Sequence, residues 1–215
     1  MPIIYHEQAK EFHLFNDEVS YIIGIMENGQ MENLYYGKAL RDREDFSHFH
    51  EETMRSQMSV CVPEPGLLSM HYTRQEYPVY GTGDYKSPAL CIRQEDGSRI
   101  TNFVYKDYKI LKGKPSLAPL PATYVEDDGE GDTLEITLHD DKINTDMVLS
   151  YTIYKDYPVI TRNTRFLHKG ESSIVLEKAM SACVEFLDMD FEMVQLSGAW
   201  ARERYVKSRR LEMGI

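Results

Sequence analysis

The stretch "TLEITLHDDKINTDMVLSYTIY", residues 133–154, decides the fold of this chain. Apolar residues alternate with polar ones in both of its halves: Leu134, Ile136 and Leu138, then Met147, Leu149, Tyr151 and Ile153. An alternation with a period of two is typical of a β-strand that buries one face. The segment between the two halves is polar and rich in Asp, so the stretch predicts two strands separated by a turn.

The same pattern continues after this stretch. "VITRNTRFL", residues 159–167, places Ile160 and Phe166 on one face together with Arg162 and Thr164. "SSIVLEKA", which follows a polar turn, begins another strand. The face of the first of these strands is therefore mixed in character, with apolar and polar residues in one register.

Turn signals divide the rest of the chain into short segments. Asn28-Gly29 lies between two apolar runs and is a strong hairpin signal. Asp96-Gly97 marks another turn, and helical patterns are scarce. Short strands separated by regular turns favour an antiparallel sandwich. We therefore predict an all-β fold, with residues 1–215 forming one domain.

Composition limits the partners and the compartment. The 215 residues carry a net charge of -11, and such a surface repels phosphate backbones and anionic lipids. We therefore expect no nucleic-acid partner and no membrane partner. The cysteines are Cys61, Cys91 and Cys183, an odd number without a CxxC pair, which argues against a disulfide framework and a structural zinc site. Since the N-terminus also lacks the pattern of a signal peptide, we expect a cytoplasmic protein.

The acidic and histidine clusters do not indicate catalysis or metal binding. The acidic pairs are Glu51-Glu52, Asp127-Asp128 and Asp140-Asp141, all in segments that we interpret as solvated turns or loops. Neighbouring carboxylates in such turns keep similar pKa values and cannot divide into an acid and a base. His48 and His50 lie in the polar segment 42–58, which we predict to be a solvated loop with at most one turn of helix. The sequence predicts no metal site and no cofactor.

"EYPVYGTGDYKSPAL", residues 76–90, combines aromatic residues with two glycines. Gly81 and Gly83 permit positive φ angles, and the Asp84 side chain can cap nearby amides. Its three tyrosines, Tyr77, Tyr80 and Tyr85, offer flat faces that suit either a sugar or a neighbouring domain. We favour a rigid, packed loop at a domain contact, and direct ligand binding is the alternative.

With this loop included, the chain resembles the N-terminal domain of the bacterial α-galactosidases of glycoside hydrolase family 36. Five stretches carry the resemblance in order: 29–40, 75–90, 97–126, 149–170 and 196–204. The third contains Gly-Lys-Pro and Leu-Pro-Ala-Thr-Tyr, and the last is "LSGAWARER" with the single Trp of the chain. Five ordered matches are a far stronger signal than any one of them.

The resemblance implies an antiparallel β-supersandwich of the galactose mutarotase-like type, which we expect to be incomplete in this chain. It implies a catalytic (β/α)8 barrel and a small C-terminal β domain as further parts of the enzyme, neither of them within residues 1–215. The implied chemistry is retaining hydrolysis of terminal α-galactosyl residues by two Asp residues of the barrel. The resemblance therefore assigns no catalytic residue here and implies an N-terminal portion that is inactive alone.

The resemblance also implies one contribution to a sugar site. Tetrameric members of the family place a loop of this domain in the pocket of a neighbouring subunit, and the corresponding loop here is 46–66. We expect Phe49, Glu52 and Thr53 to contact the substrate in trans, the polar ones through its hydroxyls, with α-galactosides as ligands and a homo-oligomer as the assembly. The alternative from another class is a stand-alone carbohydrate-binding or oligomerisation module.

Overall fold

The computed structural model describes residues 2–50, 69–186 and 190–212 of the chain. The chain forms two compact units, residues 1–184 and residues 185–215, and each unit is described by itself. Among the described residues the regular structure is almost entirely β-strand, with one short 3₁₀ turn. No helix in the described ranges has the length and apolar character needed to cross a membrane.

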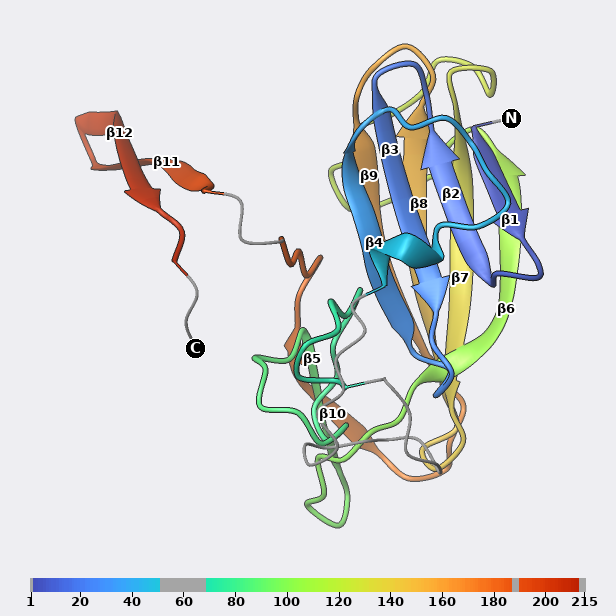
Figure 1. Cartoon of the computed structure of the whole chain (residues 1–215). Coiled ribbons are helices and arrows are strands. Elements are labelled where there is room, and N and C mark those ends of the chain that lie inside the picture. The colour runs from blue at the N-terminus through green and yellow to red at the C-terminus, as the bar shows by residue number, and fades with distance from the viewer. Residues whose placement is uncertain (1, 51–68, 187–189, 213–215) are drawn as a thin grey trace. The chain divides into compact units, whose positions relative to one another are not determined.

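The first unit is built on two four-stranded antiparallel sheets that lie face to face (Figure 1). One sheet contains β1 (Ile3–His6), β2 (Glu11–Phe15), β3 (Val19–Ile25) and β4 (Met31–Lys38) in that order. The other contains β6 (Val104–Lys112), β7 (Gly131–Asp140), β8 (Thr145–Tyr154) and β9 (Ile160–His168) in that order. Each strand pairs with its neighbour in sequence, so both sheets are simple meanders. The prediction of an all-β antiparallel sandwich is confirmed.

The stretch 133–154 forms the central hairpin of the second sheet. β7 and β8 pair without a register break, from Gly131 opposite Tyr154 to Asp140 opposite Thr145. Their alternating apolar residues face the other sheet, and large, fully buried side chains come from both layers: Phe12, Leu14 and Ile23 on one, Leu134, Ile136 and Tyr151 on the other. Fully burying one such side chain stabilises the fold by roughly 1.5–3 kcal/mol.

The turn after β7 corrects one expectation. Asp140 is only 3% exposed, so it does not lie in a solvated turn as predicted. Its Oδ1 accepts hydrogen bonds from the backbone N–H groups of Lys142 and Ile143, and its Oδ2 accepts one from the Asn102 N–H at 2.7 Å. The side chain therefore shapes the turn, as Asp in turns commonly does. It also fastens the turn to the segment before β6, and that long-range contact explains its burial.

Other turn predictions are confirmed. Gly29, between β3 and β4, has a φ of 81°, and Gly97 has a φ of 85°. The strand before Gly97 is β5 (Leu90–Gln94), and it pairs with β10 (Ile174–Ala179) rather than with the strand that follows the turn. In the loop 76–90, Gly81 and Gly83 have φ angles of 103° and 88°, in the region that glycine tolerates best.

The second unit contains a hairpin of β11 (Glu192–Ala199) and β12 (Arg202–Arg210), with Trp200 at its tip. Leu196 pairs with Val206, and with Val194 these residues form the apolar part of one hairpin face. Their exposed fractions are 64%, 68% and 61%, and that of Trp200 is 94%. Within the described residues of the second unit, nothing covers this apolar face.

Candidate functional site

The predicted sugar-contact loop begins with a short, well-anchored segment, residues 46–50. Ser47–Phe49 form a 3₁₀ turn, η1, within the polar segment for which the sequence allowed a turn of helix. Phe49 belongs to this segment, whereas Glu52 and Thr53 lie outside the described residues. The contacts of residues 46–50 therefore define the base of the predicted site.

Phe46 fixes the start of the segment. Its ring is 1% exposed and packs with Ile22 and Leu34 in a second, smaller apolar cluster. Its backbone N–H donates to Oε2 of Glu11 at 2.8 Å, and Glu11 is itself 1% exposed. An apolar anchor and a charge-assisted hydrogen bond thus hold the segment against the first sheet.

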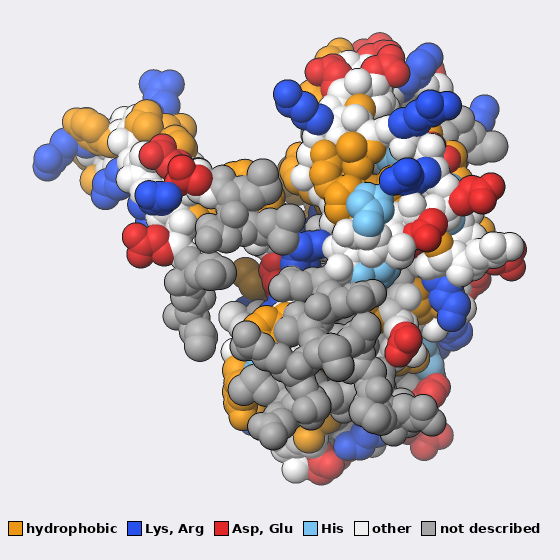
Figure 2. All heavy atoms as spheres, in the orientation of Figure 1, with side chains coloured by type: hydrophobic (Ala, Val, Ile, Leu, Met, Phe, Trp, Pro, Cys, Tyr) orange, Lys and Arg blue, Asp and Glu red, His pale blue; other side chains and the backbone are white. Residues whose placement is uncertain are grey.

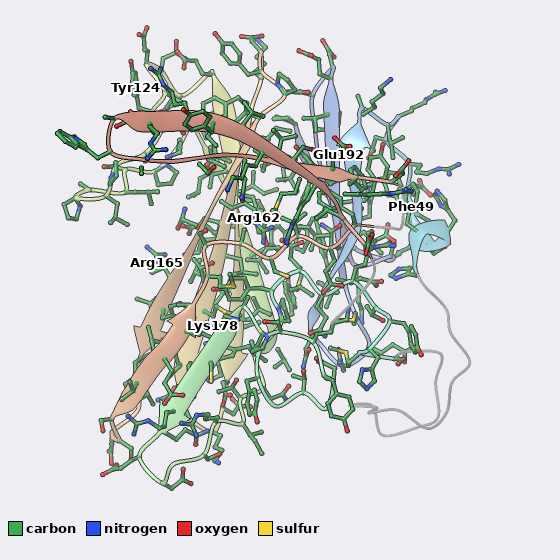
Figure 3. The ribbon with its side chains drawn as sticks, turned by 90° about the vertical axis from the view of Figure 1, so that its left-hand side faces the viewer. Phe49, Tyr124, Arg162, Arg165, Lys178 and Glu192 are labelled. Carbon is green, nitrogen blue, oxygen red and sulfur yellow. The ribbon has the colours of Figure 1, made fainter. Side chains whose placement is uncertain are left out.

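Phe49, which Figure 3 labels beside η1, is held through both its ring and its backbone. The ring stacks on Tyr35 of β4 with a centroid separation of 5.2 Å and an interplanar angle of 26°. The carbonyl oxygen accepts a hydrogen bond from Nη2 of Arg74 at 2.9 Å, and the same nitrogen also donates to the carbonyl of Leu34. The Phe49 side chain is half-buried, so part of its ring is left for contact with another group.

His50 corrects the prediction of a solvated histidine. Its Nδ1 donates to Oε2 of Glu32 at 2.7 Å, and its Nε2 lies 3.7 Å from Oε1 of Glu11. Both carboxylates come from strands of the first sheet and are almost fully buried. Their hydrogen bonds and charges, Glu11 first and then Glu32, raise the pKa of His50 to about 10. At neutral pH a charged imidazole therefore ties the end of the segment to two buried carboxylates.

A cavity of about 510 Å³ opens beside this segment. Its walls come from the end of β4 onward and include Leu40, Arg41, Asp42, Arg43, Phe46, His48 and Phe49. On the face that carries β4 and η1, histidine, basic and acidic side chains gather around apolar ones (Figure 2). An apolar wall with a few convergent polar groups is the usual composition of a small-ligand site, and hydroxyl-rich ligands suit guanidinium and imidazole donors.

A second polar cluster lies in the core of the first unit. Glu76 is fully buried and accepts hydrogen bonds from the hydroxyls of Tyr21 and Tyr151 at 2.7 and 2.8 Å, and from Nδ2 of Asn33. The guanidinium of Arg162 lies 2.5 Å from Oε1 of Glu76. Burial lowers the pKa of Arg162, but the Glu76 carboxylate together with the hydroxyls of Tyr151 and Tyr21 more than compensates, so the pKa stays above its ordinary value. This ion pair explains why Arg162 lies on the inner face of β9.

The same cluster holds the last residues of the first unit. Nη1 of Arg162, which Figure 3 labels on β9, donates to the carbonyl of Cys183 at 3.0 Å. Tyr77 is 6% exposed, and its hydroxyl donates to the carbonyl of Met180. Segment 180–184 is therefore fixed by side chains from the sandwich and from the loop 76–90. This contact supports the interpretation of that loop as a packed one at Tyr77.

Comparison with known proteins identifies the family of this chain. The family model "Glycosyl hydrolase family 36 N-terminal domain" matches residues 29–215. The chain belongs to this family. It is 39% identical, over its whole length, to the α-galactosidase AgaA of Geobacillus stearothermophilus, of which it covers 29%. The chain thus spans less than a third of the length of this relative.

Solved structures of family 36 α-galactosidases have the same fold. AgaB from Geobacillus stearothermophilus matches all of this chain with a TM-score of 0.91 at 39% identity, and the match covers 29% of that chain. A variant of AgaA in complex with raffinose matches 95% of this chain with a TM-score of 0.89 at 39% identity, and covers 28% of that structure. The sandwich described above is therefore the N-terminal fold of these enzymes.

In the loop 76–90 of this family 36 domain, the residues around Asp84 are hydrogen-bonded to its carboxylate, and two tyrosines are exposed. Asp84 accepts hydrogen bonds from the Lys86 backbone N–H, the Thr82 hydroxyl and the Gln75 amide, which confirms its predicted capping role. Tyr80 and Tyr85 are 48% and 80% exposed. The loop is hydrogen-bonded at its buried side and presents two aromatic rings at its outer side.

In the described part of this family 36 domain, no two carboxylates form an acid–base pair around the cavity. Among the described residues that line it, Asp42 is the only one with a carboxylate. Glu11 and Glu32 are buried, and they are bound to the Phe46 N–H and to His50. Asp127 accepts the Gly129 N–H in a turn, as predicted.

Sequence reasoning missed one group of potential metal ligands in this domain. His6, His13 and Asp42 come from β1, β2 and the segment after β4, and one ligand atom of each lies within 4.8 Å of the others. The three residues follow no ligand-spacing motif, and Asp42 lies far from the two histidines in sequence. The pairing of β1 with β2 and the packing of the segment after β4 bring them together, so no local pattern could have found them.

Proposed function

We propose that this chain is the non-catalytic N-terminal portion of an α-galactosidase. The enzyme hydrolyses terminal α-galactosyl residues of oligosaccharides of the melibiose and raffinose type, with retention of configuration. The observation that carries the proposal is the match of residues 29–215 to the N-terminal domain of family 36, together with coverage of only 29% of AgaA. The complex of an AgaA variant with raffinose supports the substrate class.

The geometry of the described residues supports a non-catalytic role. A retaining glycosidase needs two carboxyl groups roughly 5–5.5 Å apart on either side of the scissile bond. Here the described cavity has one carboxylate in its lining, Asp42, and the buried Glu11 and Glu32 are held by His50. The principal partner that we propose is therefore the catalytic barrel of the same enzyme.

The segment 46–66 is proposed to contribute to a sugar site of a neighbouring subunit in a homo-tetramer. Support comes from its base, which is fastened at Phe46, Phe49 and His50 to buried groups of the first sheet. A fixed base reduces the conformational entropy lost when the loop binds a ligand. In this proposal Phe49, Glu52 and Thr53 contact substrate, and α-galactosides are the ligands.

A cytoplasmic location is part of the same proposal. Cys91 and Cys183 are thiols in the described structure, and thiols of this kind persist in reducing compartments. Oxidative crosslinking of the purified chain with a mild disulfide oxidant measures whether these thiols are accessible.

The first experiment assays the purified 215-residue chain on an aryl α-galactoside. We expect no turnover, because the chain lacks a suitable pair of carboxylates in its described part. Titration of the same sample with melibiose separates the alternative: saturable sugar binding by the chain alone favours a stand-alone carbohydrate-binding module. Measurable hydrolysis with retention would overturn the assignment of chemistry to another part of the enzyme.

The second experiment addresses the loop in the full-length enzyme. Glu52→Ala and Thr53→Ala should raise KM for raffinose more than for an aryl galactoside, because the longer substrate reaches further from the reacting bond. Asp127→Ala, in an exposed turn of the sandwich, is the matched control. Unchanged kinetics on melibiose and raffinose would remove the loop from the site while leaving the family assignment intact.

A further inference from the structure

Three side chains from separate elements converge beside the anchored segment. Nε2 of His6, Nδ1 of His13 and Oδ1 of Asp42 all lie within 4.8 Å of one another. Oδ1 of Asp42 is the common point, 3.1 Å from the His6 nitrogen and 2.7 Å from the His13 nitrogen. β1 and β2 supply the histidines, and the segment after β4 supplies the carboxylate.

We propose that His6, His13 and Asp42 bind one Zn²⁺ ion, with a water molecule as the fourth ligand. Two imidazole nitrogens and one carboxylate oxygen are a donor set that zinc commonly takes, with an open fourth position. The cavity lined by Asp42 gives that position access to solvent. The site is outside the active-site chemistry proposed above and does not depend on it.

The two contacts of Asp42 require only a small rearrangement, and the two imidazole nitrogens, which lie within 4.8 Å of each other, must reach a similar spacing. Zinc bonds to nitrogen and oxygen are about 2.0–2.2 Å long, which places tetrahedral ligand atoms roughly 3.3 Å apart. The observed separations of 2.7 and 3.1 Å are those of hydrogen bonds that a metal ion replaces, so Asp42 must retreat by roughly 0.5 Å. Its side chain is 31% exposed and follows the end of β4, so it has room to move.

The buried part of the site already has the supporting contacts of a metal ligand. His13 is fully buried, and its other ring nitrogen, Nε2, lies 3.0 Å from Oγ of Ser20. Ser20 is also fully buried, and its oxygen accepts the Leu40 N–H at 2.9 Å. A hydrogen bond at the far nitrogen fixes the ring so that Nδ1 faces the metal.

The charges around the cavity select among cations. Arg41 and Arg43 line the same cavity as Asp42 and oppose a positive ion there. A hard ion such as Mg²⁺, which needs several oxygen ligands, gains too little from one carboxylate to offset this repulsion. Imidazole nitrogens bind zinc strongly enough to do so. Bound zinc would tie β1 and β2 to the chain that leads into residues 46–50.

The experiment uses the 215-residue chain, treated with a chelator and then dialysed. Calorimetric titration with ZnCl₂ should show one equivalent of saturable binding. His6→Gln and Asp42→Asn should each weaken it by at least about tenfold, since loss of supporting contacts alone costs 10–100-fold. The control is His48→Gln, which changes a histidine of the same cavity wall outside the three ligands and should leave the affinity unchanged.

A second measurement tests zinc binding in the unmodified chain, so its result does not depend on whether the variants fold. Co²⁺ added to the unmodified chain should give the intense visible bands of tetrahedral coordination, and these bands should disappear on addition of one equivalent of Zn²⁺. The absence of saturable heat near one equivalent, or equal zinc affinity in the H6Q/D42N double variant, would overturn the proposal. Weak octahedral cobalt bands would do the same, and the three side chains would then be a hydrogen-bonded contact only.

Discussion

The strands β8 and β12 show how differently the two units use the same secondary structure. All ten residues of β8 are buried, whereas all nine residues of β12 are exposed. Both strands pair in antiparallel fashion and both contain apolar as well as polar residues, so pairing alone does not separate them. The difference is that β8 lies centrally in its sheet, which faces a second sheet, while β12 has only β11 as a described neighbour.

This difference shows which interactions stabilise the sandwich and which stabilise the hairpin. Two-stranded hairpins are marginally stable in water, because backbone pairing alone does not offset the entropy of ordering the chain. The sandwich adds apolar burial and a buried ion pair between layers. The hairpin keeps Val194, Leu196 and Val206 on one exposed face. We expect substitutions of buried residues in the first unit to be costly and substitutions in the hairpin to be nearly neutral.

The largest effect is expected at the buried ion pair. Arg162→Ala removes the partner of the buried Glu76 carboxylate and should lower the free energy of unfolding by about 3–5 kcal/mol. The matched control on the same strand is Arg165→Ala (Figure 3), because Arg165 is 56% exposed and lies 3.7 Å from Glu135. Its cost should stay below about 1 kcal/mol. Urea unfolding followed by circular dichroism measures both, and similar costs would contradict the assignment of the ion pair to the core.

The next effect tests apolar burial directly. Ile136→Ala, in the fully buried face of β7, should cost about 2–5 kcal/mol. Leu196→Ala, on the exposed hairpin face, should change the unfolding free energy by no more than about 0.5 kcal/mol. The urea midpoints of the two variants are compared under the condition that the denaturant dependence of the unfolding free energy is unchanged. A loss of stability at Leu196 as large as that at Ile136 would show that the hairpin face is covered in solution.

A smaller effect concerns the polar anchor at His50. Its folded-state pKa is raised to about 10, so its stabilisation is fully present below the unfolded value of roughly 6.5 and is lost as the pH rises to about 10. We expect the unmodified chain to lose on the order of 1–3 kcal/mol more than His50→Gln between these pH values. The control is His71→Gln, at a histidine that contacts Tyr85 instead. Parallel pH profiles for the chain and for His50→Gln would disprove the ion pair.

The sequence predicted those parts of the fold that depend on neighbouring residues. The alternation in 133–154 located β7 and β8, and Asn28-Gly29 located the turn between β3 and β4. The pairing of β5 with β10 was not predicted, because it joins segments about 80 residues apart and no local pattern encodes it.

The candidate site was predicted less well for the same reason. His50 meets Glu11 and Glu32 only because β2, β3 and β4 pair in a particular register. Asp140 became buried through a contact with Asn102, which is 38 residues away. Local sequence indicates the polar character of these residues, but their partners are set by tertiary packing. Glu52 and Thr53 stay predictions, because they lie outside the described residues.

The smallest expected effect concerns the fluorescence of Trp200, which tests the exposure of the hairpin without a change in stability. Trp200 is the only tryptophan, so its fluorescence reports on the hairpin tip alone. At 94% exposure it should emit at the long wavelength of a solvated indole and be quenched by acrylamide almost as efficiently as free N-acetyltryptophanamide. Trp200→Phe should leave the urea midpoint unchanged, because the ring has no packing to lose. A blue-shifted, poorly quenched emission that returns to the solvated value on dilution would show that copies of the chain cover the hairpin. That result would place the hairpin among buried strands such as β8 and would remove the contrast between the two units.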